Sequence, residues 1–169
     1  MLDIKIGYVS AHQNLKLVEK DLSKASVVGL DTETTSLDAL TGKIRLIQIA
    51  TADACWVLDM FQLPNAPVKE LMEKLLSNKR VVKVAQNFKF DSKFLATNLG
   101  IDLRSIESVF DTYLSAKLLE GGQVGANHGC GLDDLCSRLL NIHLDKSFQK
   151  FDWAGMLYKE PIAYAGVDA

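Results

Sequence analysis

The amino-acid sequence predicts a single α/β domain, spanning residues 1–169, in which helices flank a mixed sheet. The chain has 169 residues and a hydrophobic content of 48%, which suits one sizeable core. Strand-like apolar runs follow one another early in the sequence, whereas strands and helices alternate later. Antiparallel strands followed by alternating strand and helix units are typical of a mixed sheet covered by helices.

The first part of the chain supplies one helix and three neighbouring strands. Apolar residues at three- and four-residue spacing predict a helix over about 13–25. The run at 27–31 is apolar and β-branched, so we expect a buried strand that ends at Asp31. The runs at 44–50 and 55–59 are also strand-like, and a short polar segment separates them. These three strands are expected to lie side by side.

The later part of the chain alternates between helix and strand. Helices are indicated by apolar spacing, strands by short β-branched runs, and a helix end by Gly100. The expected order is a helix at 68–76, a strand at 81–85, a helix at 90–99, a weaker strand at 108–110, a helix at 111–119, a glycine-rich loop at 121–131, a helix at 132–140 and a short terminal helix that carries Tyr164.

Charge and cysteine content limit the cellular location and the classes of binding partner that we expect. The net charge is only −2, so no basic field attracts the chain to a polyanion or a membrane, and any such binding must be local. The three cysteines form no C-x-x-C pair, and the N-terminus lacks a signal-peptide pattern, which predicts a reducing, cytoplasmic location. No apolar stretch reaches the roughly 18–20 residues of a membrane span. The oligomeric state stays open.

Four acidic residues and a tyrosine form the candidate catalytic site. Asp31 and Glu33 are two residues apart at a strand end, so strand alternation directs both carboxylates the same way. By itself this pair also fits a solvated turn. Asp91 follows another strand, and Tyr164 precedes Asp168 by four residues, which places the phenol and the carboxylate on one helical face.

Three segments carry a family resemblance: VVGLDTETTSL (27–37), QNFKFD (86–91) and YAGVDA (164–169). In this order they resemble the three motifs of the 3'-5' exonuclease superfamily that uses three aspartates and one glutamate. A tyrosine rather than a histidine in the third motif is similar to the branch that contains ribonuclease D and the proofreading domain of family A DNA polymerases. The resemblance implies a ribonuclease H-like fold and release of nucleoside 5'-monophosphates from the 3' end of single-stranded nucleic acid, RNA or DNA.

The resemblance also implies two divalent cations. Carboxylate oxygens suit the hard cations Mg²⁺ or Mn²⁺, and two such ions can stabilise both the attacking and the leaving oxygen. By match to the family, Asp31 contacts both ions, Glu33 and Asp168 hold the ion with the attacking water, and Asp91 holds the second. A phenol with a pKa near 10 is a poor base at neutral pH, so Tyr164 is expected to orient the water.

Four further residues match substrate-contacting positions of the family. Thr34 and Leu37 are expected to meet the terminal nucleotide, with Leu37 wedged against a base. Asn87 and Phe90 match contacts in the second motif, although Phe90 also fits an ordinary core aromatic. Asp111 begins the helix predicted at 111–119, where it fits either an N-cap or a position near the cations.

The motifs do not decide whether the substrate is RNA or DNA. The segment LDKSFQKFDW at 144–153 resembles a stretch that precedes the third motif in ribonuclease D-like proteins, and it favours RNA processing. Within it, Lys146 and Gln149 fit either phosphate contacts or a solvated connection. QNFKFD leans instead toward the polymerase domain, so a DNA-directed proofreading or repair exonuclease is the alternative. A non-catalytic nucleic-acid-binding domain is a third interpretation, which the presence of all four acids and Tyr164 disfavours.

Overall fold

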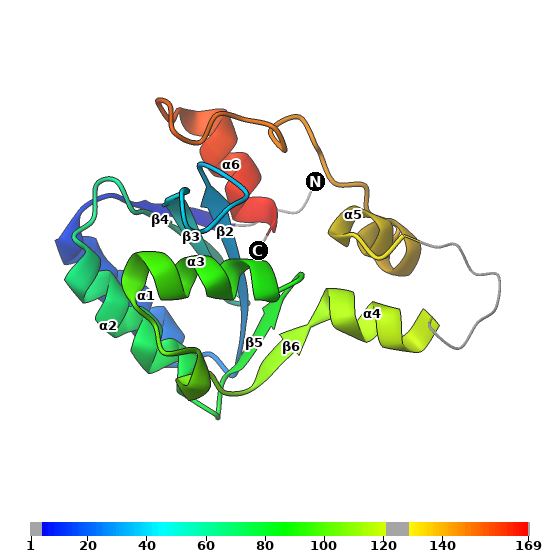
Figure 1. The fold of residues 1–169 in the computed structure, drawn as a ribbon, viewed down its shortest axis with the longest axis horizontal. Helices are drawn as coiled ribbons and strands as arrows, with labels where there is room; N and C mark the ends of the chain where they lie inside the picture. Colours follow the sequence, from blue (N-terminus) through cyan, green and yellow to red (C-terminus); the bar gives the residue numbers. More distant parts are fainter. Residues whose placement is uncertain (1–4, 121–128, 169) are drawn as a thin grey trace.

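A six-stranded mixed sheet forms the centre of the molecule (Figure 1). The computed structural model describes residues 5–120 and 129–168. The strand order is β1-β4-β3-β2-β5-β6, and β3 alone runs antiparallel to its neighbours, β2 and β4. The strands are β1 Lys5–Val9, β2 Val27–Thr34, β3 Ile44–Ala50, β4 Ala54–Asp59, β5 Val82–Ala85 and β6 Val109–Asp111.

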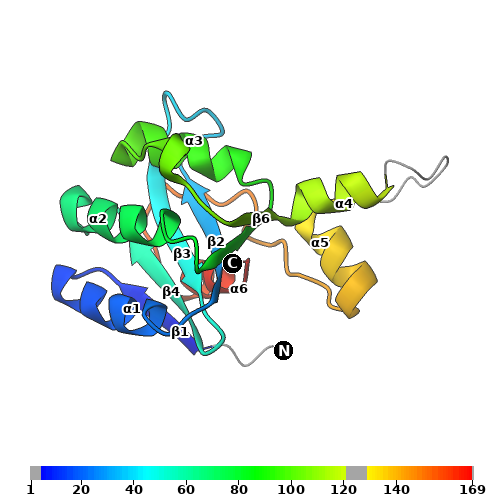
Figure 2. The same ribbon diagram turned by 90° about the horizontal axis from the view of Figure 1, so that it is seen from below.

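Helices cover both faces of this sheet. The helices are α1 Leu15–Leu22, α2 Asn65–Leu76, α3 Lys89–Leu99, α4 Thr112–Glu120, α5 Leu132–Leu135 and α6 Lys159–Asp168. The first three share one face, α6 lies on the other, and α4 and α5 extend beyond β6 (Figures 1 and 2). None of the helices in the described ranges is long and apolar enough to cross a membrane.

Each face of the sheet has its own apolar core. The larger core joins α1, α2 and α3 to β2, β3 and β4 around Val18, Leu30 and Phe94. The smaller core joins β3 and β4 to α6 around Leu46 and Ala165. Because each face of the sheet buries apolar surface against helices, the hydrophobic effect stabilises the packing of both helical layers on the sheet.

The predicted fold class is confirmed, and the three early strands do lie side by side in the order β4-β3-β2. The helix end predicted at Gly100 is also confirmed, because this residue adopts the left-handed conformation that caps α3, with φ 66°. The glycine-rich loop predicted at 121–131 lies mostly outside the described residues.

Two expectations about the elements were wrong in detail, and one strand was not expected. β2 does not end at Asp31 but continues to Thr34, because Glu33 remains paired with Leu46 of β3. The helix predicted at 132–140 changes from α5 into a π-helical turn, η3, at Cys136–Leu140. The edge strand β1 was not predicted from sequence; it pairs in parallel with β4, a contact between distant segments that leaves little local pattern.

Candidate active site

Strand alternation in β2 separates core residues from the predicted catalytic acids. Val28, Leu30 and Thr32 are buried on one side of the strand, and the first two belong to the larger core beneath the α3 face. Asp31 and Glu33 are half-buried and take the intervening positions, opposite Gln48 and Leu46 of β3. Both carboxylates therefore belong to the sheet face that α6 covers, as their spacing predicts.

Asp91 is attached to β2 by a buried hydrogen bond. It lies in the first turn of α3 and is 3% exposed. The Thr32 hydroxyl donates to Asp91 Oδ1 at 2.6 Å, so this carboxylate contacts the residue between Asp31 and Glu33. Burial raises the pKa of Asp91 from 3.8 to about 6, while the hydrogen bond from Thr32 acts in the opposite direction. Two of the predicted motifs thus meet at one point of β2.

Tyr164 places the third motif on the sheet face that α6 covers, which is the face of Asp31 and Glu33. It packs against the smaller core, and its ring centroid lies 5.7 Å from that of Phe148. A Cβ on Gly166 would lie 2.8 Å from Ile6 Cδ1, so glycine permits α6 to approach β1 closely. Val167 and Asp31 line the same cavity of about 630 Å³, which places the end of α6 beside β2.

Asp168 is the last residue of α6, and its side chain lies outside the described part of the chain. Among the side chains that the structure does describe, no group of three or more His, Cys, Asp or Glu residues is arranged to hold a metal. Of the four predicted acids, the structure describes the side chains of Asp31 and Glu33 on β2 and of Asp91 on α3.

The four predicted substrate residues lie on β2, in the loop after it and at the start of α3. Thr34 ends β2, and its hydroxyl donates to the Ser36 carbonyl at 2.7 Å. Leu37, in the following loop, is 88% exposed. Asn87 is exposed and Phe90 is half-buried; the Phe90 ring packs against the larger core. Leu37 and Asn87 are therefore exposed to solvent, whereas Phe90 is partly used in packing.

Asp111 fixes the backbone that presents Asn87. Its carboxylate accepts hydrogen bonds from the backbone N–H groups of Asn87 and Phe88 at 3.0 and 2.9 Å. It also accepts from Tyr113 and Leu114 at 2.9 and 3.1 Å, which confirms the N-cap interpretation for α4. Asn87 has a left-handed φ of 57°, and the two bonds hold this less common conformation in place.

The comparisons with known proteins identify the family of this chain. The family model described as 3'-5' exonuclease matches residues 6–169. The chain belongs to the 3'-5' exonuclease family. It is 32% identical to DNA polymerase I of Aquifex aeolicus over 95% of this chain and 25% of the polymerase. It is 26% identical to ribonuclease D of Granulibacter bethesdensis over 95% of this chain and 37% of that enzyme.

A solved structure shows the same fold as this exonuclease domain. The crystal structure of the Trypanosoma brucei RNase D complex with RNA U12 matches with a TM-score of 0.84 and 20% identity. The match covers 99% of this chain and 59% of that one. The ribonuclease H-like fold implied by the motifs is therefore confirmed, and so is the resemblance to ribonuclease D and the polymerase domain. The chain spans only about a quarter to a third of the curated relatives named above.

Two residues of this exonuclease domain adjoin the predicted acids but were not expected from sequence. Thr32 is one of them. The sequence feature that could have indicated it is a hydroxyl residue at a core position between two acids. Gln48 is another, because it is fully buried directly opposite Asp31, and a glutamine in the apolar run of β3 marks it. The side-chain amide of Gln48 has no hydrogen-bond partner among the described residues. A buried amide in this state needs a polar neighbour at the site.

The segment at 144–153 also reaches the site. Lys146, Gln149, Asp133 and Tyr164 line one small cavity of about 150 Å³. Lys146 Nζ is paired with Asp133 Oδ2 at 2.5 Å, so its ammonium is already held by a carboxylate. The segment therefore lies beside the tyrosine that defines the family branch.

Proposed function

We propose that this domain hydrolyses the terminal phosphodiester bond at the 3' end of single-stranded nucleic acid and releases nucleoside 5'-monophosphates one at a time. The observation that supports this most directly is the contact between motifs: Asp91 is hydrogen-bonded to Thr32, between Asp31 and Glu33. In a chain of the 3'-5' exonuclease family, carboxylates supplied by one strand and by the helix that packs on it are suited to phosphoryl chemistry.

Two divalent cations, Mg²⁺ or Mn²⁺, are proposed to bind Asp31, Glu33, Asp91 and Asp168. The donor set fits these ions, because it consists of carboxylate oxygens without histidine or cysteine. The buried Asp91 carboxylate and the unpaired Gln48 amide opposite Asp31 both favour a charged, hydrated neighbour. When bound, the cations would lower the pKa of water and stabilise charge on the leaving oxygen.

The remaining residues are proposed to position water and substrate. Tyr164 donates a hydrogen bond that orients the attacking water, and Phe148 packs against its ring to limit its motion. Leu37, which is highly exposed, wedges against the terminal base. Asn87 contacts the same nucleotide from a backbone that Asp111 holds rigid. Thr34 and Phe90 complete the pocket for the terminal nucleotide.

RNA is the proposed substrate, with DNA as the second candidate. The segment at 144–153 resembles ribonuclease D-like proteins and lies beside Tyr164, which favours RNA. The 32% identity to a DNA polymerase I favours DNA instead. A cytoplasmic location accords with either substrate.

The test uses 5'-labelled single-stranded RNA, single-stranded DNA and a mismatched duplex, each with Mg²⁺, Mn²⁺ or a chelator. We expect a ladder of products shortened from the 3' end, formed fastest from RNA, with no cleavage in chelator. The Asp31→Asn variant, which keeps the side-chain shape without the charge, should give no ladder. Internal cuts, or cleavage that persists in chelator, would show that the proposed chemistry is wrong.

A further inference from the structure

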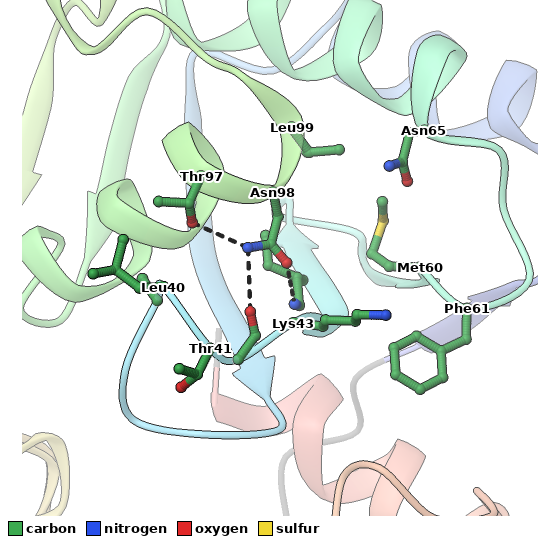
Figure 3. Close-up of a pocket in the computed structure, with 12 residues that line it drawn as sticks. Leu40, Thr41, Lys43, Met60, Phe61, Asn65, Thr97, Asn98 and Leu99 are labelled. Carbon is green, nitrogen blue, oxygen red and sulfur yellow. Dashed lines mark hydrogen bonds between the residues drawn. The ribbon is translucent and has the colours of Figure 1, made fainter.

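Another cavity lies at the C-terminal end of α3, beside Thr97, Asn98 and Leu99 (Figure 3). Its volume is about 860 Å³, within the size range of ligand pockets. It is bounded by the end of α3, the loop that follows β2 and the segment between β4 and α2. The lining residues that matter here are Leu40, Lys43, Phe61, Asn65, Thr97 and Asn98.

Hydrogen bonds from α3 give this cavity a fixed wall. Asn98 Oδ1 accepts from the Ile44 backbone N–H at 2.8 Å, and Asn98 Nδ2 donates to the Gly42 carbonyl at 3.4 Å. A Cβ on Gly42 would approach the Asp38 carbonyl to 2.9 Å, so the loop packs closely on itself. The loop that begins beside the terminal-nucleotide residues Thr34 and Leu37 is therefore anchored to the end of α3.

Phe61 presents an aromatic surface on the opposite side of the cavity. The ring is 43% exposed, and the Arg45 guanidinium lies 4.4 Å from its centroid. Arg45 is itself buried and paired with Asp59 at 3.1 Å, and Asp59 also accepts a hydrogen bond from the Tyr8 hydroxyl at 2.5 Å. The cation is thus fixed against one region of the ring, which holds Phe61 in place while much of it faces solvent.

Two exposed lysines and a threonine form a row on the outer face of α3, and this row ends at the cavity. Lys89, Lys93 and Thr97 are exposed and follow one another at four-residue spacing on α3, so they share one face of the helix. Lys43 faces the cavity from the loop (Figure 3). None of these lysines forms an ion pair with a residue in the described ranges. From Asp91 to Asn98, the helix advances about 10 Å.

We propose that this cavity binds the part of the single strand that lies 5' of the nucleotide being removed. The lysine row contacts successive phosphates, and a base enters the cavity and stacks on Phe61. Both contacts tolerate any sequence, because every nucleotide has a phosphate and every base has a π-face. This inference rests on the proposed exonuclease function, and it explains how a chain of net charge −2 retains a polyanion through local groups.

The test compares oligonucleotides of two, four, six and eight residues that share one 3' end. The readout is the ratio of kcat/KM for the octamer to that for the dinucleotide. We expect this ratio to fall about tenfold in Phe61→Leu, because a stacking contact is lost, and severalfold in Lys43→Met. Lys16→Met, on the exposed side of α1, is the matched control and should retain the wild-type ratio. Equal ratios in all four proteins would overturn the inference.

A binding titration separates this inference from the proposed activity. In chelator, a 5'-fluorescein octamer is titrated by anisotropy at several salt concentrations. Lys43→Met should bind more weakly and reduce the slope of log Kd against log salt by about 0.7. If wild-type protein shortens no oligonucleotide, the proposed function is wrong. The titration then still tests whether the cavity binds single-stranded nucleic acid, because it does not depend on cleavage. Identical Kd values and salt slopes for wild type, Lys43→Met and Phe61→Leu would contradict it.

Discussion

Replacement of Asp91 by asparagine should stabilise the metal-free protein at neutral pH. The Asp91 carboxyl is 3% exposed, and burial raises its pKa from 3.8 to about 6. At neutral pH the folded protein therefore contains a buried charge that the unfolded chain would expose to water. Asparagine removes the charge, has nearly the same shape, and can still accept the hydrogen bond that Thr32 donates to Asp91 Oδ1.

The pKa difference sets the size of this effect. One pKa unit corresponds to about 1.4 kcal/mol, so a rise from 3.8 to about 6 costs the fold about 3 kcal/mol once the group is charged in both states. The raised pKa also sets the sign. Below about pH 4 the carboxyl is protonated in both states and the cost vanishes, whereas the cost is complete above about pH 6.

The assay is urea unfolding in chelator at pH 4.5 and pH 8. At pH 8 we expect Asp91→Asn to raise the free energy of unfolding by about 2–3 kcal/mol, and at pH 4.5 the gain should shrink below about 1 kcal/mol. Asp53→Asn, an exposed acid in the turn before β4, is the control and should change stability little. Addition of Mn²⁺ at pH 8 should stabilise the wild type more than the variant.

Two results would refute this reasoning. The first is an Asp91→Asn variant that is less stable than the wild type at pH 8 in chelator, which would show that the carboxylate is compensated within the protein. The second is a gain that grows as the pH falls, because that is the sign expected for a lowered pKa. Either result would remove the argument that buried Asp91 favours a cation neighbour.

The other predictions concern activity and the supports of the site. Tyr164→Phe should retain Mn²⁺ binding by calorimetry but lower kcat by about 10- to 100-fold; equal loss of Mn²⁺ binding would contradict a water-orienting role. Asp111→Ala should reduce the free energy of unfolding by about 1–2 kcal/mol through loss of the α4 cap, with a higher KM because Asn87 is released; unchanged urea unfolding would contradict this. Gly166→Ala should lower activity by displacing α6, and Ile6→Ala in the same chain should restore it; no rescue would exclude this contact as the cause.

The sequence was sufficient for the fold class because the strands carry strong local patterns. The three apolar runs and the later alternation predict a mixed sheet, and the expected adjacency of the three early strands is observed as β4-β3-β2. The edge strand β1 was not predictable in the same way, since its partner β4 lies almost fifty residues away and two of its five residues are exposed. Boundaries also shifted where tertiary pairing outweighed local preference, as at Thr34.

The candidate site residues were predicted where residue type and spacing indicate the chemistry. Asp31, Glu33, Asp91 and Tyr164 come from the motifs, and in the structure Asp91 is hydrogen-bonded to Thr32 of β2. Their supports were not found, because a buried threonine or glutamine has no distinctive spacing. The role of Thr32 becomes visible only when α3 packs on the sheet and its hydroxyl meets Asp91.

Alternation in β2 makes the core and the predicted catalytic acids depend on one register. Leu30 and Thr32 are buried on the α3 side, so Asp31 and Glu33 necessarily take the other side. A slip of one residue would bury both acids in the larger core and expose the leucine. The pairing of Asp31 with Gln48 and of Glu33 with Leu46 fixes this register, and the irregularity after Glu33 ends it. The apolar packing that stabilises the sheet therefore also orients the charges proposed to act on the phosphodiester bond.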